Sequence, residues 1–222
     1  MSTGWARARR ALAIATVVLA AGCGGGSGTA TVRYSPGPPA PAETFSFDQE
    51  PAGKVPVGAA VFSGSWQLRQ EAGAPSPPNA LCQTATAEFP AVQIGDGVFT
   101  DVTVSVRVKP ISGTQDQAGG VVLRVQDAGN YYILRANALE GNVNLYRYVG
   151  GQRSDIKDGS AEVSAGRWHE LRAVARGRHL QGFFDGRMVV EADDDTFKAG
   201  KVGLWTKSDS VTCFDDFAAA GV

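Results

Sequence analysis

Within the segment from Thr100 to Lys109, valine alternates with a polar residue without a break from Asp101 onward. A period of two places successive side chains on opposite faces of a β-strand, so the valines are expected to face a core. Shorter runs of the same kind recur up to about residue 218, separated by turn residues such as Asp185-Gly186. We therefore predict an all-β fold of about ten to twelve short strands, arranged as a two-sheet antiparallel jelly-roll sandwich.

Residues 1–22 have the features of an export signal. Three arginines and no acid precede a short apolar stretch, and Leu19-Ala20-Ala21-Gly22 leads directly to Cys23. Small residues before a cysteine at this place resemble the lipobox of bacterial lipoproteins, which implies cleavage before Cys23 and lipid attachment to it. Several acyl chains would hold the protein stably on a membrane. An ordinary signal peptide with an incidental cysteine is the alternative.

Residues 23–43 are predicted to form a lipid-anchored flexible linker, and residues 44–222 a single domain. The linker begins with glycine and serine and continues into a proline-rich stretch. Such a composition cannot bury apolar surface, whereas the part that follows has a normal length for one domain. We expect an exported protein whose domain stands off the cell envelope on the periplasmic side or at the cell surface.

The charge of the domain argues against one class of partner, and its cysteines indicate the compartment in which it folds. Removal of residues 1–22 takes away three arginines and lowers the formal net charge from −1 to −4. A mildly acidic domain offers no electrostatic surface for nucleic acid. Of the three cysteines, Cys82 and Cys213 lie in the domain. Because exported proteins fold in an oxidising compartment, we predict a Cys82–Cys213 disulfide, with two buried thiols as the alternative.

Several short motifs follow one another from about Phe45 to Ala218. They include Ala118-Gly119-Gly120-Val121, Asn130-Tyr131-Tyr132, Trp168-His169-Glu170-Leu171, Phe184-Asp185-Gly186-Arg187 and Gly200-Lys201-Val202-Gly203-Leu204-Trp205. Their order and spacing resemble the 3-keto-disaccharide hydrolase domain family of the concanavalin A-like lectin/glucanase and laminin G-like superfamily. The resemblance implies a jelly-roll sandwich and a connection with carbohydrates. Because the superfamily includes lectins, hydrolases and adhesive modules, it does not decide between binding and catalysis.

Hydrolysis of a glycosidic bond needs two carboxylates that flank it. The run Glu191 to Asp195 is the nearest match to the alternating acids of laminarinase-like enzymes, but its position after a hairpin predicts a solvated turn. In the pair Asp215-Asp216, one acid is expected to point inward and to bind backbone groups. An enzyme would need Asp209 or Asp215 in a groove with a second acid, so the catalytic residues stay unassigned.

No cofactor is predicted, although calcium stays open. His169 and His179 are expected at the surface, and two histidines without a cysteine cluster do not supply a zinc site. The resemblance to laminin G-like domains implies calcium bound by oxygen atoms at the rim of the sandwich. Asp127 and Asn130 are the candidate ligands for such an ion.

A sugar-binding surface combines aromatic rings, which stack on C–H faces, with planar polar groups, which bind hydroxyls. Arg124, Arg135 and Arg147 occupy three predicted consecutive strands and are expected to line one polar face. The other candidate ligand-binding residues extend this surface: Asn130, Tyr132, Asn137, Asn142, Tyr146, Trp205 and Lys207. An ordinary outer sheet face, on which arginine and tyrosine are common, is the alternative.

These features together predict an envelope-anchored carbohydrate-binding or adhesive module that is not an enzyme. Its expected partners are a glycan or envelope polysaccharide and, through the lipid, a membrane. A glycan-processing hydrolase similar to the 3-keto-disaccharide hydrolases is the first alternative. A purely structural envelope protein without a small ligand is the second.

Overall fold

The computed structural model describes residues 42–222. The predicted signal peptide, Cys23 and most of the predicted linker lie outside the described residues, so the structure does not test these predictions. Between residues 42 and 222 the chain forms strands and turns but no helix, and hence none that could span a membrane.

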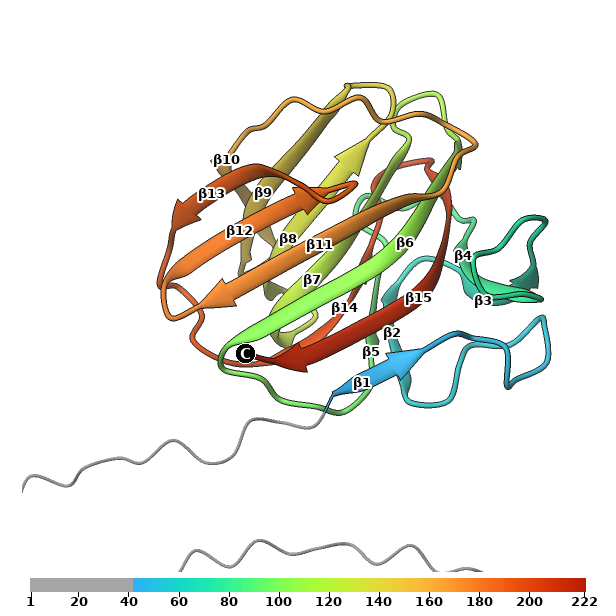
Figure 1. The fold of residues 1–222 in the computed structure, drawn as a ribbon, viewed down its shortest axis with the longest axis horizontal. Coiled ribbons are helices and arrows are strands. Elements are labelled where there is room, and N and C mark those ends of the chain that lie inside the picture. The colour runs from blue at the N-terminus through green and yellow to red at the C-terminus, as the bar shows by residue number, and fades with distance from the viewer. Residues whose placement is uncertain (1–41) are drawn as a thin grey trace, which may run out of the picture. The chain divides into compact units, whose positions relative to one another are not determined.

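Fifteen strands form two antiparallel sheets that pack face to face (Figure 1). The eight-stranded sheet has the order β13-β12-β11-β6-β15-β4-β3, and β1 pairs with β15. Its strands are β1 (Glu43–Phe45), β3 (Trp66–Gln70), β4 (Asn79–Gln83), β6 (Val102–Ser112), β11 (His169–Arg176), β12 (His179–Phe184), β13 (Arg187–Asp193) and β15 (Val211–Gly221).

The seven-stranded sheet lies behind it in Figure 1 and has the order β10-β9-β8-β7-β14-β5-β2. Its strands are β2 (Ala59–Ser63), β5 (Ala91–Ile94), β7 (Ala118–Asp127), β8 (Asn130–Asn137), β9 (Asn142–Val149), β10 (Gln152–Lys157) and β14 (Lys201–Trp205). The predicted two-sheet antiparallel sandwich is therefore confirmed.

The core lies between the two sheets and follows the alternation of the sequence. Val102, Val104, Val106 and Val108 of β6 are buried and belong to this core, while the polar residues between them are only partly buried. Apolar burial of this extent is the main stabilising contribution to such a sandwich. The strand continues past Pro110 to Ser112, and β15 pairs with it beyond the proline after a register shift.

Tight turns fix the register of the hairpins. Asp185 and Gly186 join β12 to β13 with φ angles of 45° and 77°, and both angles lie in the left-handed region. Two successive residues of this kind make the turn that suits the twist of a hairpin, which is why Asp-Gly is favoured there. The sequence predicted this hairpin from the same dipeptide.

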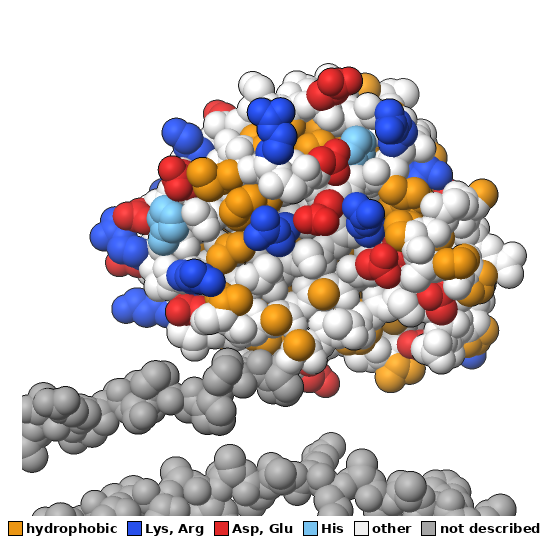
Figure 2. Space-filling model, viewed as in Figure 1, with side chains coloured by type: hydrophobic (Ala, Val, Ile, Leu, Met, Phe, Trp, Pro, Cys, Tyr) orange, Lys and Arg blue, Asp and Glu red, His pale blue; other side chains and the backbone are white. Residues whose placement is uncertain are grey.

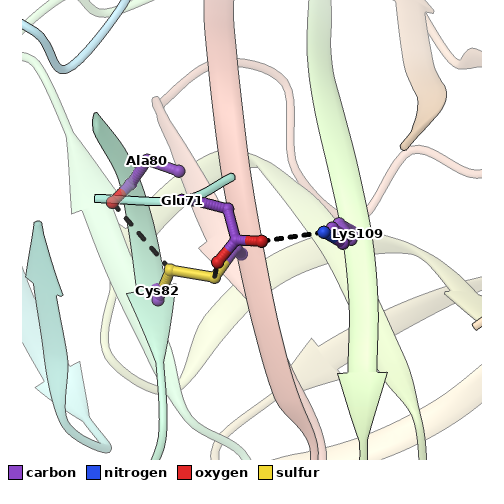
Figure 3. Close-up of a disulfide and its surroundings, with 5 residues drawn as sticks. Glu71, Ala80, Cys82 and Lys109 are labelled. Carbon is purple, nitrogen blue, oxygen red and sulfur yellow. Dashed lines mark hydrogen bonds and ion pairs between the residues drawn. A yellow bond between two sulfur atoms is a disulfide. The ribbon is translucent and has the colours of Figure 1, made fainter. Parts of the chain in front are cut away.

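A disulfide joins β4 to β15 on the outer side of the eight-stranded sheet. Cys82 and Cys213 are direct partners in the register of these strands, and both are buried (Figure 3). Glu71 lies beside the sulfur atoms and forms an ion pair of 2.7 Å with Lys109. The bond confirms the predicted pairing and indicates an oxidising compartment outside the cytoplasm.

Candidate functional site

The outer face of the seven-stranded sheet carries most of the predicted ligand-binding residues. On β8, Tyr132, Leu134 and Ala136 point into the inter-sheet core. The alternate residues, Arg135 among them, therefore face outward. By the same alternation, the outer face also carries four residues of β9, next to Trp205 of β14: Asn142, Asn144, Tyr146 and Tyr148.

A polar hollow of about 380 Å³ opens at one end of this face. The β8–β9 turn forms one wall, and the segment after β10 forms the other, tied to it by a hydrogen bond from Val143 N to the carbonyl of Gly159 (2.9 Å). Polar side chains dominate the lining, which consists of Glu140, Gly141, Asn142, Asn144, Asp158, Gly159 and Ser160.

Arg135 lies beside this hollow and is almost fully buried, with 1% of its surface exposed. Its Nη1 donates to Glu140 (2.9 Å), and its Nη2 donates to the side-chain oxygen of Asn142 (3.0 Å) and the hydroxyl of Tyr146 (2.7 Å). Its Nε finds no acceptor among the described residues. An unpaired buried N–H is costly, so Nε is a donor that the described residues leave unsatisfied beneath the hollow.

Tyr146 and Glu140 keep defined protonation states at neutral pH. Burial raises the pKa of the Tyr146 phenol, so its hydroxyl stays protonated while it accepts from Arg135 and from Asn144 Nδ2 (3.1 Å). Burial alone would raise the pKa of Glu140, but hydrogen bonds from Asn142 and Arg135 outweigh it and lower the pKa. The lining of the hollow offers the hydroxyl of Ser160, the amides of Asn142 and Asn144 and the carboxylate of Glu140, all of which are suited to sugar hydroxyls.

Asn137 and Lys207 lie together at the end of the same face. Both bind the buried carboxylate of Asp116, Asn137 at 2.8 Å and Lys207 at 3.1 Å. Asp209 holds the loop that carries Asp116, because it accepts hydrogen bonds from the backbone N–H groups of residues 114–116. These bonds hold the pKa of Asp209 well below its usual range. Asp209 thus anchors a loop and is not placed to act as an acid.

An aromatic hollow of about 210 Å³ opens elsewhere on the face. The rings of Tyr131 and Tyr148 pack with centroids 4.9 Å apart, and Phe89 stacks on Trp205 at 5.6 Å. Trp205 itself is fully buried beneath this layer. The lining consists of Phe62, Ser63, Glu88, Phe89, Ala91, Ala128, Tyr131 and Tyr148.

Arg124 does not lie on this face, so the expectation that three arginines line it is wrong. A register shift in β7 between Leu123 and Asp127 interrupts the alternation, and Arg124 takes a left-handed φ of 52°. Its buried guanidinium donates to the carbonyls of Thr100 (3.0 Å) and Phe197 (2.8 Å). Arg124 is therefore a structural cross-link.

Arg147 and Tyr132 lie on the opposite side of the sheet from Arg135. They are direct partners in the β8–β9 register, and the ring of Tyr132 belongs to the inter-sheet core. Both bind Asp194, with Arg147 at 2.8 Å and the Tyr132 hydroxyl at 2.6 Å. Since β9 alternates strictly, Arg147 cannot share a face with Tyr146.

Asn130 occupies the β7–β8 turn, apart from the polar hollow. Its Nδ2 donates to Asp127 (2.8 Å), and its side-chain oxygen accepts from Gly150 N (2.9 Å). Asp127 also accepts from Gly129 N. These bonds account for the turn by themselves, and calcium at Asp127 and Asn130 stays a prediction of the sequence.

The carboxylates considered for catalysis have structural contacts. Asp215 is buried, which raises its pKa, and it accepts from the backbone N–H and hydroxyl of Ser76, both at 2.8 Å. Asp193 lies beside Arg178 and His179. The acids that line a hollow are instead Glu140, Asp158 and Glu88, none of which the sequence analysis selected.

Other residues of the site were not predicted from the sequence either. Asn144 alternates with Asn142 and Tyr146, so the period of two could have identified it. Phe89 and Arg153 carry no such signal, because they come from an irregular segment and an edge strand.

The opposite face of the sandwich differs in character. Figure 2 shows basic and acidic side chains mixed over the eight-stranded sheet. Arg172 and Glu170 of β11 form one pair among them, at 3.9 Å. Interspersed charges of both signs are typical of an ordinary solvated surface.

The two-sheet sandwich with hollows on one outer face places the protein in the class of concanavalin A-like jelly-roll domains. The chain belongs to the 3-keto-alpha-glucoside-1,2-lyase-like domain family, whose model matches residues 63–218. This confirms the resemblance found in the sequence.

Comparisons with individual proteins agree with this assignment. A levanase of Bacillus subtilis (strain 168) is 26% identical over 106 residues, which span 47% of this chain but only 16% of the levanase. The carbohydrate-binding module CBM66 from Bacillus subtilis is 19% identical, with a TM-score of 0.62 over 74% of this chain and 94% of the module. A β-glucanase of Bacillus licheniformis is 9% identical, with a TM-score of 0.56 over 82% and 98% of the two chains. The two solved structures share the fold.

Proposed function

We propose that the protein is an exported, envelope-anchored module that binds glycans in the polar hollow of the seven-stranded sheet. The observation that carries the proposal is the lining of this hollow, in which Glu140, Asn142 and Asn144 are held by hydrogen bonds to the buried Arg135 and Tyr146 behind them. Sugar sites in proteins combine such planar polar groups with nearby aromatic rings. The names of a levanase, a carbohydrate-binding module and a β-glucanase among the similar proteins support the same class of ligand.

Isothermal titration of the purified protein with levan, β-glucan and 3-keto-disaccharides tests the proposal. We expect binding of at least one of these glycans at millimolar concentration or below. Asn144→Ala removes an amide that lines the hollow, and Tyr146→Phe removes the hydroxyl that holds this amide, so each should weaken that binding about 5- to 10-fold. Gln181→Ala on the other sheet is the matched control and should leave the affinity unchanged. No binding of any glycan in the panel would contradict the proposal.

The envelope anchor is a separate part of the proposal and rests on the sequence before Cys23. Mass spectrometry of the protein from a bacterial host that processes lipoproteins should find an N-terminal, acylated Cys23. Cys23→Ala should release the protein from the membrane fraction. An unmodified Cys23 in the mature chain would rule out the anchor without affecting glycan binding.

A glycan-processing enzyme is the second candidate, because Glu140 and Asp158 both line the polar hollow and the family is lyase-like. The lowered pKa of Glu140 suits a base better than an acid. A 1,2-lyase needs a base that removes the proton from sugar carbon 2, so that a double bond forms between carbons 1 and 2 as the bond from carbon 1 to the leaving oxygen breaks and this oxygen takes a proton from water. Turnover of a 3-keto-disaccharide that Glu140→Gln abolishes would favour this candidate over a pure binding role.

A further inference from the structure

Arg153 lies between the two hollows of the seven-stranded sheet. It comes from the edge strand β10, where it pairs with Tyr148 of β9. Its guanidinium carbon is 4.5 Å from the ring centre of Tyr146, 5.2 Å from that of Phe89 and 5.9 Å from that of Trp205. Three aromatic rings therefore hold the guanidinium in place through cation–π contacts.

The Nη1 atom of Arg153 is buried and has no hydrogen-bond partner among the described residues. Arginine carries five N–H donors in a planar fork, and a buried donor without an acceptor is destabilising. The rings fix the orientation of this donor before any ligand arrives. A ligand oxygen that reached Nη1 would complete its hydrogen bonding at little cost in side-chain ordering.

Arg153 lines neither hollow itself, but it contacts Phe89, which lines the aromatic hollow, and Tyr146, which binds a residue of the polar hollow. On one side it covers Tyr146, whose hydroxyl binds Asn144 in the lining of the polar hollow. On the other side it covers Phe89, which lines the aromatic hollow. Asn144 and Tyr148 line the two hollows and lie four positions apart on one face of β9, a span of about 13 Å.

The charges around the hollows are of both signs, with the carboxylates of Asp158 and Glu88 in the linings and the cation of Arg153 between them, which disfavours a ligand of either charge. Arg135 is paired with Glu140, and Lys207 is paired with Asp116, so neither is free for an anion. Asp158 lines the polar hollow, and Glu88 lines the aromatic hollow. A carboxylate or phosphate on the ligand would meet these like charges.

We propose that the two hollows are subsites of one groove for a neutral oligosaccharide of at least two sugar units, and that Arg153 joins them by donating from Nη1 to an oxygen of the chain. One sugar binds in the polar hollow, and the C–H face of another stacks on Tyr148 and its neighbours. This inference rests on the proposed function and adds the class of ligand and the residue that selects for chain length.

The test compares a monosaccharide with an oligosaccharide of the same sugar, using fructose against short levan oligosaccharides and glucose against short β-glucan oligosaccharides. Wild-type protein should bind the oligosaccharide more tightly than the monosaccharide. Arg153→Ala and Tyr148→Ala should each weaken oligosaccharide binding about tenfold and leave monosaccharide binding within twofold. Asn144→Ala should weaken both.

Two further variants separate these effects from misfolding. Arg153→Lys keeps the stem and charge but loses the planar fork, so it should retain the melting temperature and still lose oligosaccharide affinity. Arg172→Ala removes a guanidinium that stacks on Phe183 of the other sheet at 3.8 Å, and it should leave binding unchanged.

The outcomes distinguish the two proposals. If Asn144→Ala weakens binding while Arg153→Ala and Tyr148→Ala change neither affinity, the proposed function stands and the two-subsite groove is wrong. If the wild type binds monosaccharide and oligosaccharide equally, the groove is also wrong. If no sugar of either series binds, both proposals fail.

Discussion

Asp194 is expected to stabilise the fold by an amount that depends on pH. It accepts hydrogen bonds from the Tyr132 hydroxyl (2.6 Å) and Thr196 N (2.9 Å) and forms an ion pair with Arg147 (2.8 Å). Burial alone would raise the pKa of Asp194, but these partners outweigh it and lower the pKa to about 2 from the ordinary 3.8. Replacement by asparagine removes the charge that they stabilise.

The size of the effect follows from the change in pKa. A decrease from 3.8 to about 2 corresponds to about 2.4 kcal/mol. The Arg147 side chain is 43% exposed, so water screens its ion pair, and we expect Asp194→Asn to cost about 1–2 kcal/mol at pH 7. Because the folded pKa lies below the unfolded one, the stabilisation is nearly complete at about pH 5 and is lost progressively as the pH falls through 3.8 toward 2. About half should remain at pH 3.

Urea unfolding of the wild type and Asp194→Asn at pH 7, 5 and 3 measures this difference. Asp96→Asn is the matched control, because Asp96 pairs with Lys201 at 3.1 Å but is 86% exposed. Its replacement should cost less than about 0.5 kcal/mol at every pH. An Asp194→Asn variant as stable as the wild type at pH 7, or equally weakened from pH 7 to pH 3, would refute the reasoning.

Three further predictions concern the fold. Removal of both Cys82 and Cys213, which are 131 positions apart, should lower the free energy of unfolding by about 4–5 kcal/mol in urea, and a loss below about 1 kcal/mol would contradict it. Gly182→Ala places a methyl group against Leu134 of the opposite sheet and should cost about 1–3 kcal/mol by thermal unfolding; an unchanged melting temperature would count against close packing there. Arg124→Met leaves two backbone carbonyls unpaired and should cost about 2–4 kcal/mol, whereas reduced glycan affinity of the folded variant would show that Arg124 belongs to the site.

Local patterns in the sequence were sufficient to predict the sandwich. The valines of β6 identify the buried face of this strand, because successive side chains along a strand point to opposite faces. Asp185-Gly186 identified its hairpin because few residues adopt two left-handed conformations in succession. The disulfide followed from the expected compartment and the two available cysteines.

The site was only partly predictable, because it depends on which strands pair and where they slip. Because of the bulge in β7, Arg124 does not lie on the face that strict alternation predicts for it. No local residue pattern predicted this bulge. Arg147 and Tyr146 are neighbours in the sequence and therefore lie on opposite faces of β9. The prediction that placed both on one polar face did not take this alternation into account. Phe89 and Arg153 meet only through the order of the seven-stranded sheet, so their contact is a property of the tertiary structure.

A residue-resolved NMR titration of the protein with short levan and β-glucan oligosaccharides decides whether a glycan binds and where. Binding on the outer face of the seven-stranded sheet predicts that amide signals of β8, β9 and β10 and of the segment around Phe89 shift first and saturate together. Signals of β6, β11 and β12 should stay in place. Shifts confined to the eight-stranded sheet, or no shift with either series, would contradict a glycan site on this face.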